Sequence, residues 1–300
     1  MKPRQIREKS CCKRTIMAVW GVEECIFDTA VAVVAPFGWA VVNMLARYWL
    51  FTSKRGRHLS WREQQVSEHC TSLIHAVWSS AVALITASDP SMHTNIIFSR
   101  SDWFRRAYPV TVGYMLYDSV LIGLALGPYR EHLTRAERSL QWQYVGHHAF
   151  IIATGFYKTV MQPEVGDFAV SVFLLQELTN IPHNLRLLSL TADKSERKWL
   201  SVDASSPWHL IIGIWFLLSY LVCRFGCVLW FCVLYARQIS VPVYLVPTRI
   251  PLKCSVGTAL VFSLNLYWLR FIVAKVAARI NELRCAAKAT PPSAGEQKRS

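Results

Sequence analysis

The sequence predicts an all-α, polytopic membrane helical bundle of about seven transmembrane helices. Hydrophobic residues make up 53% of the 300-residue chain and charged residues only 17%, whereas soluble domains carry about a quarter charged residues. Apolar windows long enough to cross a membrane recur along the chain. Twelve Trp, eleven Tyr and fourteen Phe supply the aromatic side chains that membrane interfaces favour. These three observations together indicate a membrane protein.

Seven apolar windows define the expected spans, at 27–50, 69–87, 108–128, 143–161, 167–190, 208–235 and 256–278. Each is close to or above the roughly 20 residues that a helix needs to cross the hydrocarbon core. The first window is too long for the apolar part of a signal peptide and contains Asp28 and Pro36, so we expect a retained anchor. The sixth is long for one span and contains Arg224, which predicts a tilted or broken helix.

The distribution of Lys and Arg predicts the orientation in the membrane. If the 51–66 loop is cytosolic, the cytosolic segments hold seventeen Lys and Arg, and the opposite side holds twelve, six of them within the first fourteen residues. The positive-inside rule then favours a lumenal N-terminus and a cytosolic C-terminus. Basic loops beside an anionic leaflet also account for the net charge of +14, so we expect no nucleic-acid partner.

The chain is expected to divide into three parts. Residues 1–60 hold a basic segment and the first transmembrane helix, 61–279 form the main membrane domain, and 280–300 form a disordered cytosolic tail rich in Pro, Ser and charge. The three prolines of 240–252 predict an extended segment without helix. The nine cysteines include no CxxC pair, so no zinc site is expected.

Polar side chains inside the spans are the candidates for function. A charged residue at the centre of a membrane helix costs about 2.5–3.5 kcal/mol on insertion scales, so it normally faces the bundle interior and finds a partner. At 1.5 Å per residue from the expected ends, most of these groups fall in the cytosolic half of the bundle. The polar residues within the spans are His69, His75, Asp118, His147, His148, Glu177, Asn184, Arg186, Arg224, Asn265 and Arg270.

Two short stretches stand out among them. In "YVGHHAFII" (144–152), His147 and His148 differ by about 100° around the helix, so one can face the interior while the other packs against a partner helix. Tyr144 precedes them by three and four residues and can cover either. In "QELTNIPHNLRLL" (176–188), Pro182 removes a backbone hydrogen bond, which predicts a broken, polar-lined helix.

The order of these landmarks resembles the TLC domain, the multispan domain of ceramide synthases and several lipid-handling membrane proteins. The resemblance extends over residues 61–279, about three quarters of the chain. The similar blocks are "WREQQVSEHCTSLIHAVWS" (61–79), "GYMLYDSVLI" (113–122), "YVGHHAFII" (144–152), "QELTNIPHNLRLL" (176–188), "LVCRFG" (221–226) and "SLNLYWLRFI" (263–272).

One block departs from the synthase pattern. In ceramide synthases the paired histidines are followed by a Ser-Tyr, Asn and Arg run, then by His-Asp and a further Asp. Here no His-Asp pair follows, and Glu177 with Pro182 stands in that region. The chain therefore resembles the smaller TLC-domain-containing proteins more than the synthases.

The first functional hypothesis is a TLC-domain membrane protein of sphingolipid or phospholipid homeostasis that binds lipid in a cytosol-facing polar cavity. The resemblance implies the endoplasmic reticulum and membrane lipids as partners; protein partners stay open. We expect no bound cofactor and no metal. The expected lipid-binding residues are His69, His75, Tyr117, Tyr144, Glu177, Asn184, Arg186 and Arg224.

The alternative is an acyl-CoA-dependent N-acyltransferase that resembles ceramide synthases and acts on a sphingoid base. A neutral histidine can take the proton of the amine or accept the acyl group itself. His147 and His148 would be the catalytic residues and Asp118 would hold the imidazole tautomer, with acyl-CoA as the co-substrate. A third interpretation is that the polar residues only join helices, although such pairs average below about 1 kcal/mol in membranes.

Overall fold

The computed structural model describes residues 3–51, 61–127, 130–154, 166–192 and 206–289, and these residues are helical with short connections. The long helices are α1 (Pro3–Leu50), α2 (Trp61–Ser88), α3 (Asp102–Leu126), α4 (Arg135–Ile151), α7 (Pro207–Leu221), α8 (Cys227–Gln238) and α10 (Leu252–Ala289). The shorter elements are η2 (Pro90–His93), η3 (Arg130–His132), α5 (Asp167–Leu174), η5 (Leu175–Thr179), α6 (Asn180–Ala192), η6 (Val222–Gly226), η7 (Val243–Leu245) and α9 (Val246–Arg249). The predicted all-α bundle is confirmed.

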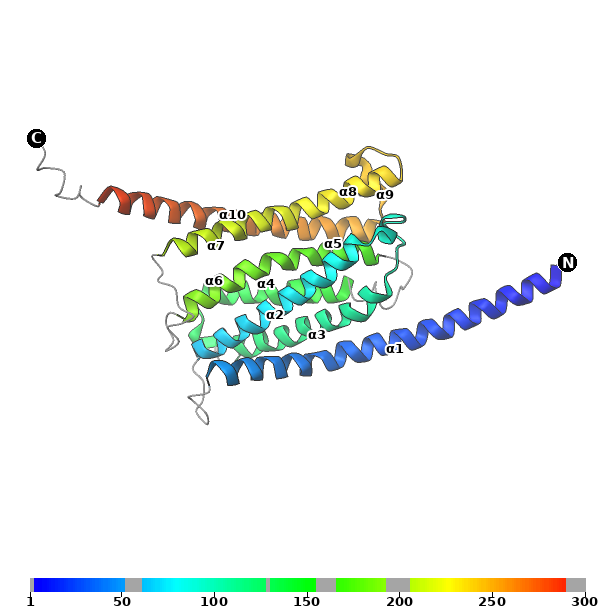
Figure 1. Ribbon diagram of the computed structural model, residues 1–300, viewed down its shortest axis with the longest axis horizontal. Coiled ribbons are helices and arrows are strands. Elements are labelled where there is room, and N and C mark those ends of the chain that lie inside the picture. The colour runs from blue at the N-terminus through cyan, green and yellow to red at the C-terminus, as the bar shows by residue number, and fades with distance from the viewer. Residues whose placement is uncertain (1–2, 52–60, 128–129, 155–165, 193–205, 290–300) are drawn as a thin grey trace, which may run out of the picture.

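The helices lie roughly parallel and the chain runs back and forth along the bundle (Figure 1). Within the described residues, α1, α2, α3, α10 and the interrupted α7–η6–α8 correspond to five of the seven windows. The windows 143–161 and 167–190 hold the shorter α4 and the interrupted α5–η5–α6, and residues 155–161 lie outside the described residues. Five segments are long and apolar enough to span a membrane, at 26–50, 63–88, 102–126, 207–238 and 254–282. The N-terminus of α1 and the C-terminal end of α10 consequently lie at opposite ends of the bundle (Figure 1).

Local sequence explains where several helices begin. Ser101 caps α3 by accepting a hydrogen bond from the Phe104 amide at 3.2 Å. At α4, Thr134 Oγ1 accepts from the Glu137 amide at 3.2 Å, and the Glu137 carboxylate accepts from the Thr134 amide at 2.7 Å. This reciprocal pair is a capping box, which satisfies two backbone donors that have no partner within the helix.

The fifth pass is broken, as the sequence predicts, but the break does not lie at Pro182. The chain leaves α5 after Leu174, forms the 3₁₀ turn η5, and resumes as α6 at Asn180. Pro182 lies in the first turn of α6, where a missing backbone N–H costs least. The break therefore precedes the proline and lies beside Glu177, at the polar part of the segment.

Two expectations about the ends of helices are wrong. The segment 240–252 is not extended throughout, because η7 and α9 form within it and Pro247 occupies the first turn of α9, a position that proline tolerates. The expected disordered tail from residue 280 is also wrong in its first part, because α10 continues as helix to Ala289. The rest of that tail, from residue 290, lies outside the described residues.

Packing is tightest in two places. One apolar cluster joins α2, α3, α5 and α8 around the fully buried Phe104, Tyr108 and Phe168. The other is the crossing of α1 and α3 at Gly113, where an added Cβ would overlap the Cβ of Ala35 and lie 3.1 Å from Pro36 Cδ. The absence of a side chain at Gly113 thus brings the two backbones together, a role that small residues commonly take between membrane helices.

Candidate functional site

Buried and half-buried polar side chains from α2, α3, α4, η5 and α6 lie close together inside the bundle. We call this group the interior polar cluster. It connects two histidines, two carboxylates and several hydroxyl groups through contacts between helices that are far apart in the sequence. Its members are His75, Ser79, Thr111, Tyr114, Asp118, Ser119, His148, Glu177 and Asn180.

His75 lies at the centre of the first half of this cluster and is 1% exposed. Its Nε2 is 2.8 Å from Ser79 Oγ, one helical turn further along α2. Its Nδ1 is 3.8 Å from Glu177 Oε2, which also accepts a hydrogen bond from Asn180 Nδ2 at 2.8 Å. The carboxylate favours a proton on Nδ1, so Nε2 is left to accept from the Ser79 hydroxyl.

The hydroxyl–imidazole–carboxylate order of Ser79, His75 and Glu177 is that of a nucleophilic triad. Ser79 is 0% exposed, however, and its hydroxyl lies 3.1 Å from the equally buried Thr111 hydroxyl. A nucleophile needs contact with substrate, and this one is enclosed by protein. We therefore assign the three residues a role in holding α2, α3 and η5 together.

Tyr114 joins the two halves of the cluster. Its ring stacks on the His75 ring with centroids 3.7 Å apart and planes 11° apart. Its hydroxyl lies 3.5 Å from Asp118 Oδ1, one turn further along α3. The tyrosine thus places the carboxylate of Asp118 relative to His75.

His148 and Asp118 form the second half. The distance from His148 Nδ1 to Asp118 Oδ2 is 3.6 Å, and Ser119 Oγ is 3.4 Å from the same nitrogen. The His148 and Asp118 side chains keep 13% and 26% of their surface exposed, so this pair is more accessible than His75 and Ser79. An imidazole held by a carboxylate on one nitrogen can exchange a proton or a hydrogen bond through the other.

A second polar group surrounds Arg224, and we call it the Arg224 group. Arg224 donates to Thr179 Oγ1 from Nε at 3.3 Å and from one terminal nitrogen at 3.2 Å. Its other terminal nitrogen donates to Asn265 Oδ1 at 3.0 Å, and Asn265 Nδ2 donates to Gln176 Oε1 at 3.3 Å. The guanidinium also lies over the Tyr220 ring, 5.1 Å from its centroid. The group ties η5, α10 and the α7–η6–α8 pass together.

The backbone around Arg224 is a π-helical turn, Val222–Gly226, between α7 and α8. Such a turn accommodates one extra residue in an otherwise regular helix. It lies where Arg224 is only 6% exposed and hydrogen-bonded on three nitrogens. The predicted irregularity of this long pass is therefore a single π-turn at the arginine.

The two neighbouring histidines of α4 separate as their spacing predicts. His148 faces Asp118, whereas the His147 ring meets the Trp268 ring edge-on with centroids 5.7 Å apart. Tyr144 also lies against Trp268, at 6.2 Å, and Trp268 Nε1 donates to Gln143 Oε1 at 3.0 Å. His147 and Tyr144 therefore lie on the α10 side of α4, away from the interior polar cluster.

The remaining predicted residues lie around these two groups. Asn184 is buried and donates to Ser72 Oγ at 3.1 Å and to the Asn180 carbonyl at 2.8 Å, which joins it to the cluster through Asn180. Tyr117 packs in an apolar cluster with Trp39, Tyr114 and Met115. His69 and Arg186 are half-buried and are not members of either polar group.

Sequence reasoning missed the residues that connect the predicted ones. These residues carry no charge and do not stand out from the apolar sequence around them: Tyr114, Ser79, Thr111, Thr179 and Gln176. The available signal was helical spacing, because Ser79 follows His75 by four positions and Tyr114 precedes Asp118 by four. Among the residues that the structure describes, no group of three or more His, Cys, Asp or Glu side chains is placed to hold a metal ion.

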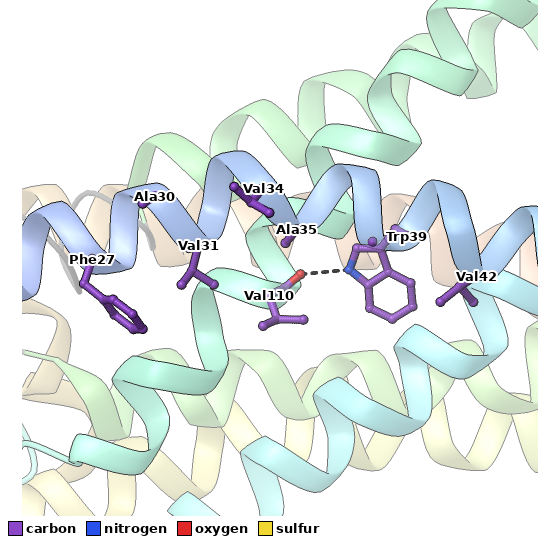
Figure 2. A pocket seen from close by; sticks show the side chains of 9 residues that line it. Phe27, Ala30, Val31, Val34, Ala35, Trp39, Val42 and Val110 are labelled. Atoms are coloured by element: carbon purple, nitrogen blue, oxygen red, sulfur yellow. Dashed lines mark hydrogen bonds between the residues drawn. The ribbon is translucent and has the colours of Figure 1, made fainter.

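An apolar groove lies along α1 beside Val110 of α3. Its volume is about 560 Å³, and Figure 2 shows Phe27, Val31 and Val110 along it. Its other lining residues are Ala30, Val34, Ala35, Gly38, Trp39 and Val42.

Trp39 forms the wall between groove and cluster. Its Nε1 donates to the Val110 carbonyl at 3.0 Å (Figure 2). The edges of its ring contact the rings of His75 and Tyr114, with centroids 5.6 and 5.3 Å apart. Trp39 therefore lines the apolar groove and also contacts the interior polar cluster.

Comparison with protein families gives the same assignment as the order of the polar blocks. The family model described as TLC domain matches residues 65–274. The chain belongs to the TLC-domain family. The matched region begins in α2 and ends in α10, so it contains the interior polar cluster and the Arg224 group, while α1 precedes it. No solved structure matches the chain.

Proposed function

We propose that this TLC-domain protein binds a membrane lipid, with an acyl chain in the groove between α1 and α3 and the polar part at the interior polar cluster. One observation carries the proposal: Trp39 lines a 560 Å³ apolar groove, and its ring also contacts His75 and Tyr114 of the interior polar cluster. Ligand sites are commonly apolar cavities of about 300–1,000 Å³ with a few polar groups at one end.

The ligand class follows from this combination. The groove is lined by aliphatic and aromatic carbons and opens on the outer surface of the bundle, where lipid chains surround a membrane helix. His148 and Asp118, at the more accessible end of the cluster, can exchange hydrogen bonds with hydroxyl, amine or amide groups. A sphingolipid or phospholipid has both parts, which supports a role in lipid homeostasis in the endoplasmic-reticulum membrane.

The test is to measure lipid retained by the purified full-length protein by mass spectrometry. Val31→Trp fills the groove, whereas Val33→Trp places the same bulk on the lipid-facing side of α1, where Val33 is 60% exposed and lines no part of the groove. We expect Val31→Trp to lower the amount of one retained lipid class at least several-fold and Val33→Trp to leave it unchanged. Equal lipid content in both variants and the wild type contradicts the proposal.

A second candidate function rests on the His148–Asp118 pair. In an acyltransferase that uses acyl-CoA, the amine of a sphingoid base attacks the thioester carbonyl, a C–N bond forms, and the C–S bond breaks to release the thiol. His148, with Nδ1 3.6 Å from Asp118 Oδ2, would take the amine proton and pass it to the leaving thiolate. His147, which packs on Trp268, would position the neighbouring helix.

Cells that lack their own ceramide synthases, supplied with sphingoid base and labelled acyl-CoA, distinguish the two functions. An acyltransferase forms N-acylated product that falls at least a hundredfold in His148→Ala and Asp118→Asn but persists in His132→Ala, whose ring is about half exposed outside the spans. Abundant, folded protein without product above background eliminates the enzyme and leaves lipid binding.

A further inference from the structure

A second, separate pocket lies at the end of the bundle where α3 stops and α4 starts. It is lined by Leu126, Arg130, Arg135, Arg138 and Trp142, and its volume is about 370 Å³. We call it the arginine pocket. None of its lining residues belongs to the interior polar cluster, and no carboxylate lines it.

The two acidic residues next to these arginines in the sequence, Glu131 and Glu137, contact other groups. Glu131 Oε1 lies 3.9 Å from His132 Nε2, and the Glu137 carboxylate accepts the Thr134 amide at 2.7 Å in the capping box. Within the described part of the chain, no ion pair joins any of the three arginines to a carboxylate. Three guanidinium groups around one concavity repel one another unless an anion lies between them.

The local sequence fixes this arrangement. Residues 135, 138 and 142 recur at intervals of three and four, so they share one face of α4, and the capping box at Thr134 sets where that helix begins. The positive end of the α4 dipole adds to the field of the arginines. Guanidinium groups offer planar forks of N–H donors that match phosphate oxygens in two-point contacts.

We propose that the arginine pocket binds a phosphate group, carried either by the headgroup of an anionic phospholipid or by a soluble phosphorylated ligand. Trp142 is 64% exposed beside the arginines, and a tryptophan in that setting is typical of the membrane–water interface. Arg138 precedes His148 by ten residues, about 15 Å along the helix axis, so the pocket is distinct from the lipid site proposed above and does not depend on it.

The test uses full-length protein in a neutral detergent and native mass spectrometry with dioctanoyl phosphatidic acid, with dioctanoyl phosphatidylcholine as the uncharged comparison. The variant replaces all three arginines with glutamine (Arg130→Gln, Arg135→Gln, Arg138→Gln). The matched control removes the same charge from exposed arginines near the opposite end of the bundle (Arg106→Gln, Arg237→Gln, Arg249→Gln). Inorganic phosphate and adenosine 3′,5′-bisphosphate are added as competitors to identify the phosphate source.

We expect phosphatidic acid to bind the wild type at least tenfold more tightly than phosphatidylcholine, and the pocket variant to lose this preference while the control keeps it. Replacement of the same three arginines by lysine should retain an intermediate affinity, because charge remains but the planar fork is lost. If the soluble phosphates compete with phosphatidic acid, the pocket is assigned to a soluble phosphorylated ligand. If they do not compete, the pocket is assigned to a phospholipid headgroup. Equal preference in the pocket and control variants overturns the proposal; single substitutions replace the triple variant if it does not fold.

Discussion

The Tyr114 ring stacks on the His75 ring at 3.7 Å while the Tyr114 hydroxyl reaches Asp118 at 3.5 Å, so one side chain connects the two histidine–carboxylate pairs of the interior polar cluster. The ring contact is broad and closely parallel, and the hydroxyl contact is at the long limit of a hydrogen bond. The stack should therefore contribute more to stability than the hydroxyl does.

Replacing Tyr114 separates these two contributions. Tyr114→Phe keeps the stack on His75 and should lower the free energy of unfolding by about 0.5 kcal/mol, the lower end for a net hydrogen bond, because this contact within α3 is long. Tyr114→Leu also removes the aromatic pair and should cost about 1 kcal/mol more. Unfolding in mixed micelles measures both. A larger loss in the phenylalanine variant would mean that Asp118 depends on the hydroxyl.

Asn265 should be needed to hold Arg224. In Asn265→Leu the guanidinium loses its acceptor at 3.0 Å and Gln176 Oε1 loses its donor at 3.3 Å. A hydrogen bond to a charged group contributes about 1.5–3 kcal/mol, so we expect a loss of that size in unfolding free energy. Ser263→Leu, at an exposed position two residues earlier on α10, is the control and should change little. Similar stability in the two variants would show that Arg224 finds another partner.

Gly113 should be intolerant of any side chain, because an added Cβ would overlap Ala35. We expect Gly113→Ala to cost about 1–3 kcal/mol of stability, as overpacking does. Gly123→Ala on the same helix meets nothing within 4 Å and should stabilise by up to about 1 kcal/mol through helix propensity. Thermal denaturation measures both, and adding Ala35→Gly should restore part of the loss. Failure of that rescue would place the strain elsewhere than at the Ala35 contact.

The capping box at the start of α4 should give a pH-dependent contribution. Hydrogen bonds from Thr134 hold the pKa of Glu137 below its ordinary value. A lowered folded-state pKa gives stability that is present above the unfolded pKa of about 4.3 and is lost as the pH falls through the folded value. The difference in melting temperature between wild type and Glu137→Gln should therefore shrink below about pH 4. Thr134→Ala should cost about 1 kcal/mol at neutral pH.

Ser139→Ala is the control for both variants, since it lies exposed on the same helix without a role in the cap. A difference that stays constant with pH would mean that the Glu137 charge contributes nothing to the cap.

Much of the fold was predictable because membrane spans are long apolar runs. Five of the seven windows correspond to helices long and apolar enough to span a membrane, and the broken fifth pass follows from the polar residues and Pro182 in its sequence. The position of that break was not predictable from proline alone, since the chain leaves the α-helix at Leu175, where Glu177 turns toward His75. Proline marks a place that tolerates an interruption, whereas contacts between helices decide where it occurs.

The candidate site was predictable only in its charged members. His75, Asp118, His148 and Glu177 stand out in apolar spans, and the structure brings them together. Which carboxylate pairs with which histidine depends on how each helix is rotated relative to its neighbours. The spacing of residues within one helix carries no information about that rotation. The groove was not predictable either, because it arises where Gly113 brings α3 against a helix outside the matched domain.

The π-turn at Val222–Gly226 adds one residue to the α7–η6–α8 pass, at the position of Arg224. One additional residue in a helix changes the facing of everything after it by about 100°. The π-turn absorbs this extra residue, so the apolar patterns of 207–221 and 227–238 differ in phase although both halves pack in the bundle, and Arg224 contacts Thr179 from the turn. Deletion of one residue within the turn would restore a regular α-helical turn and keep the facing of α8, whereas the same deletion within the regular turns of α8 would rotate all later residues by about 100°.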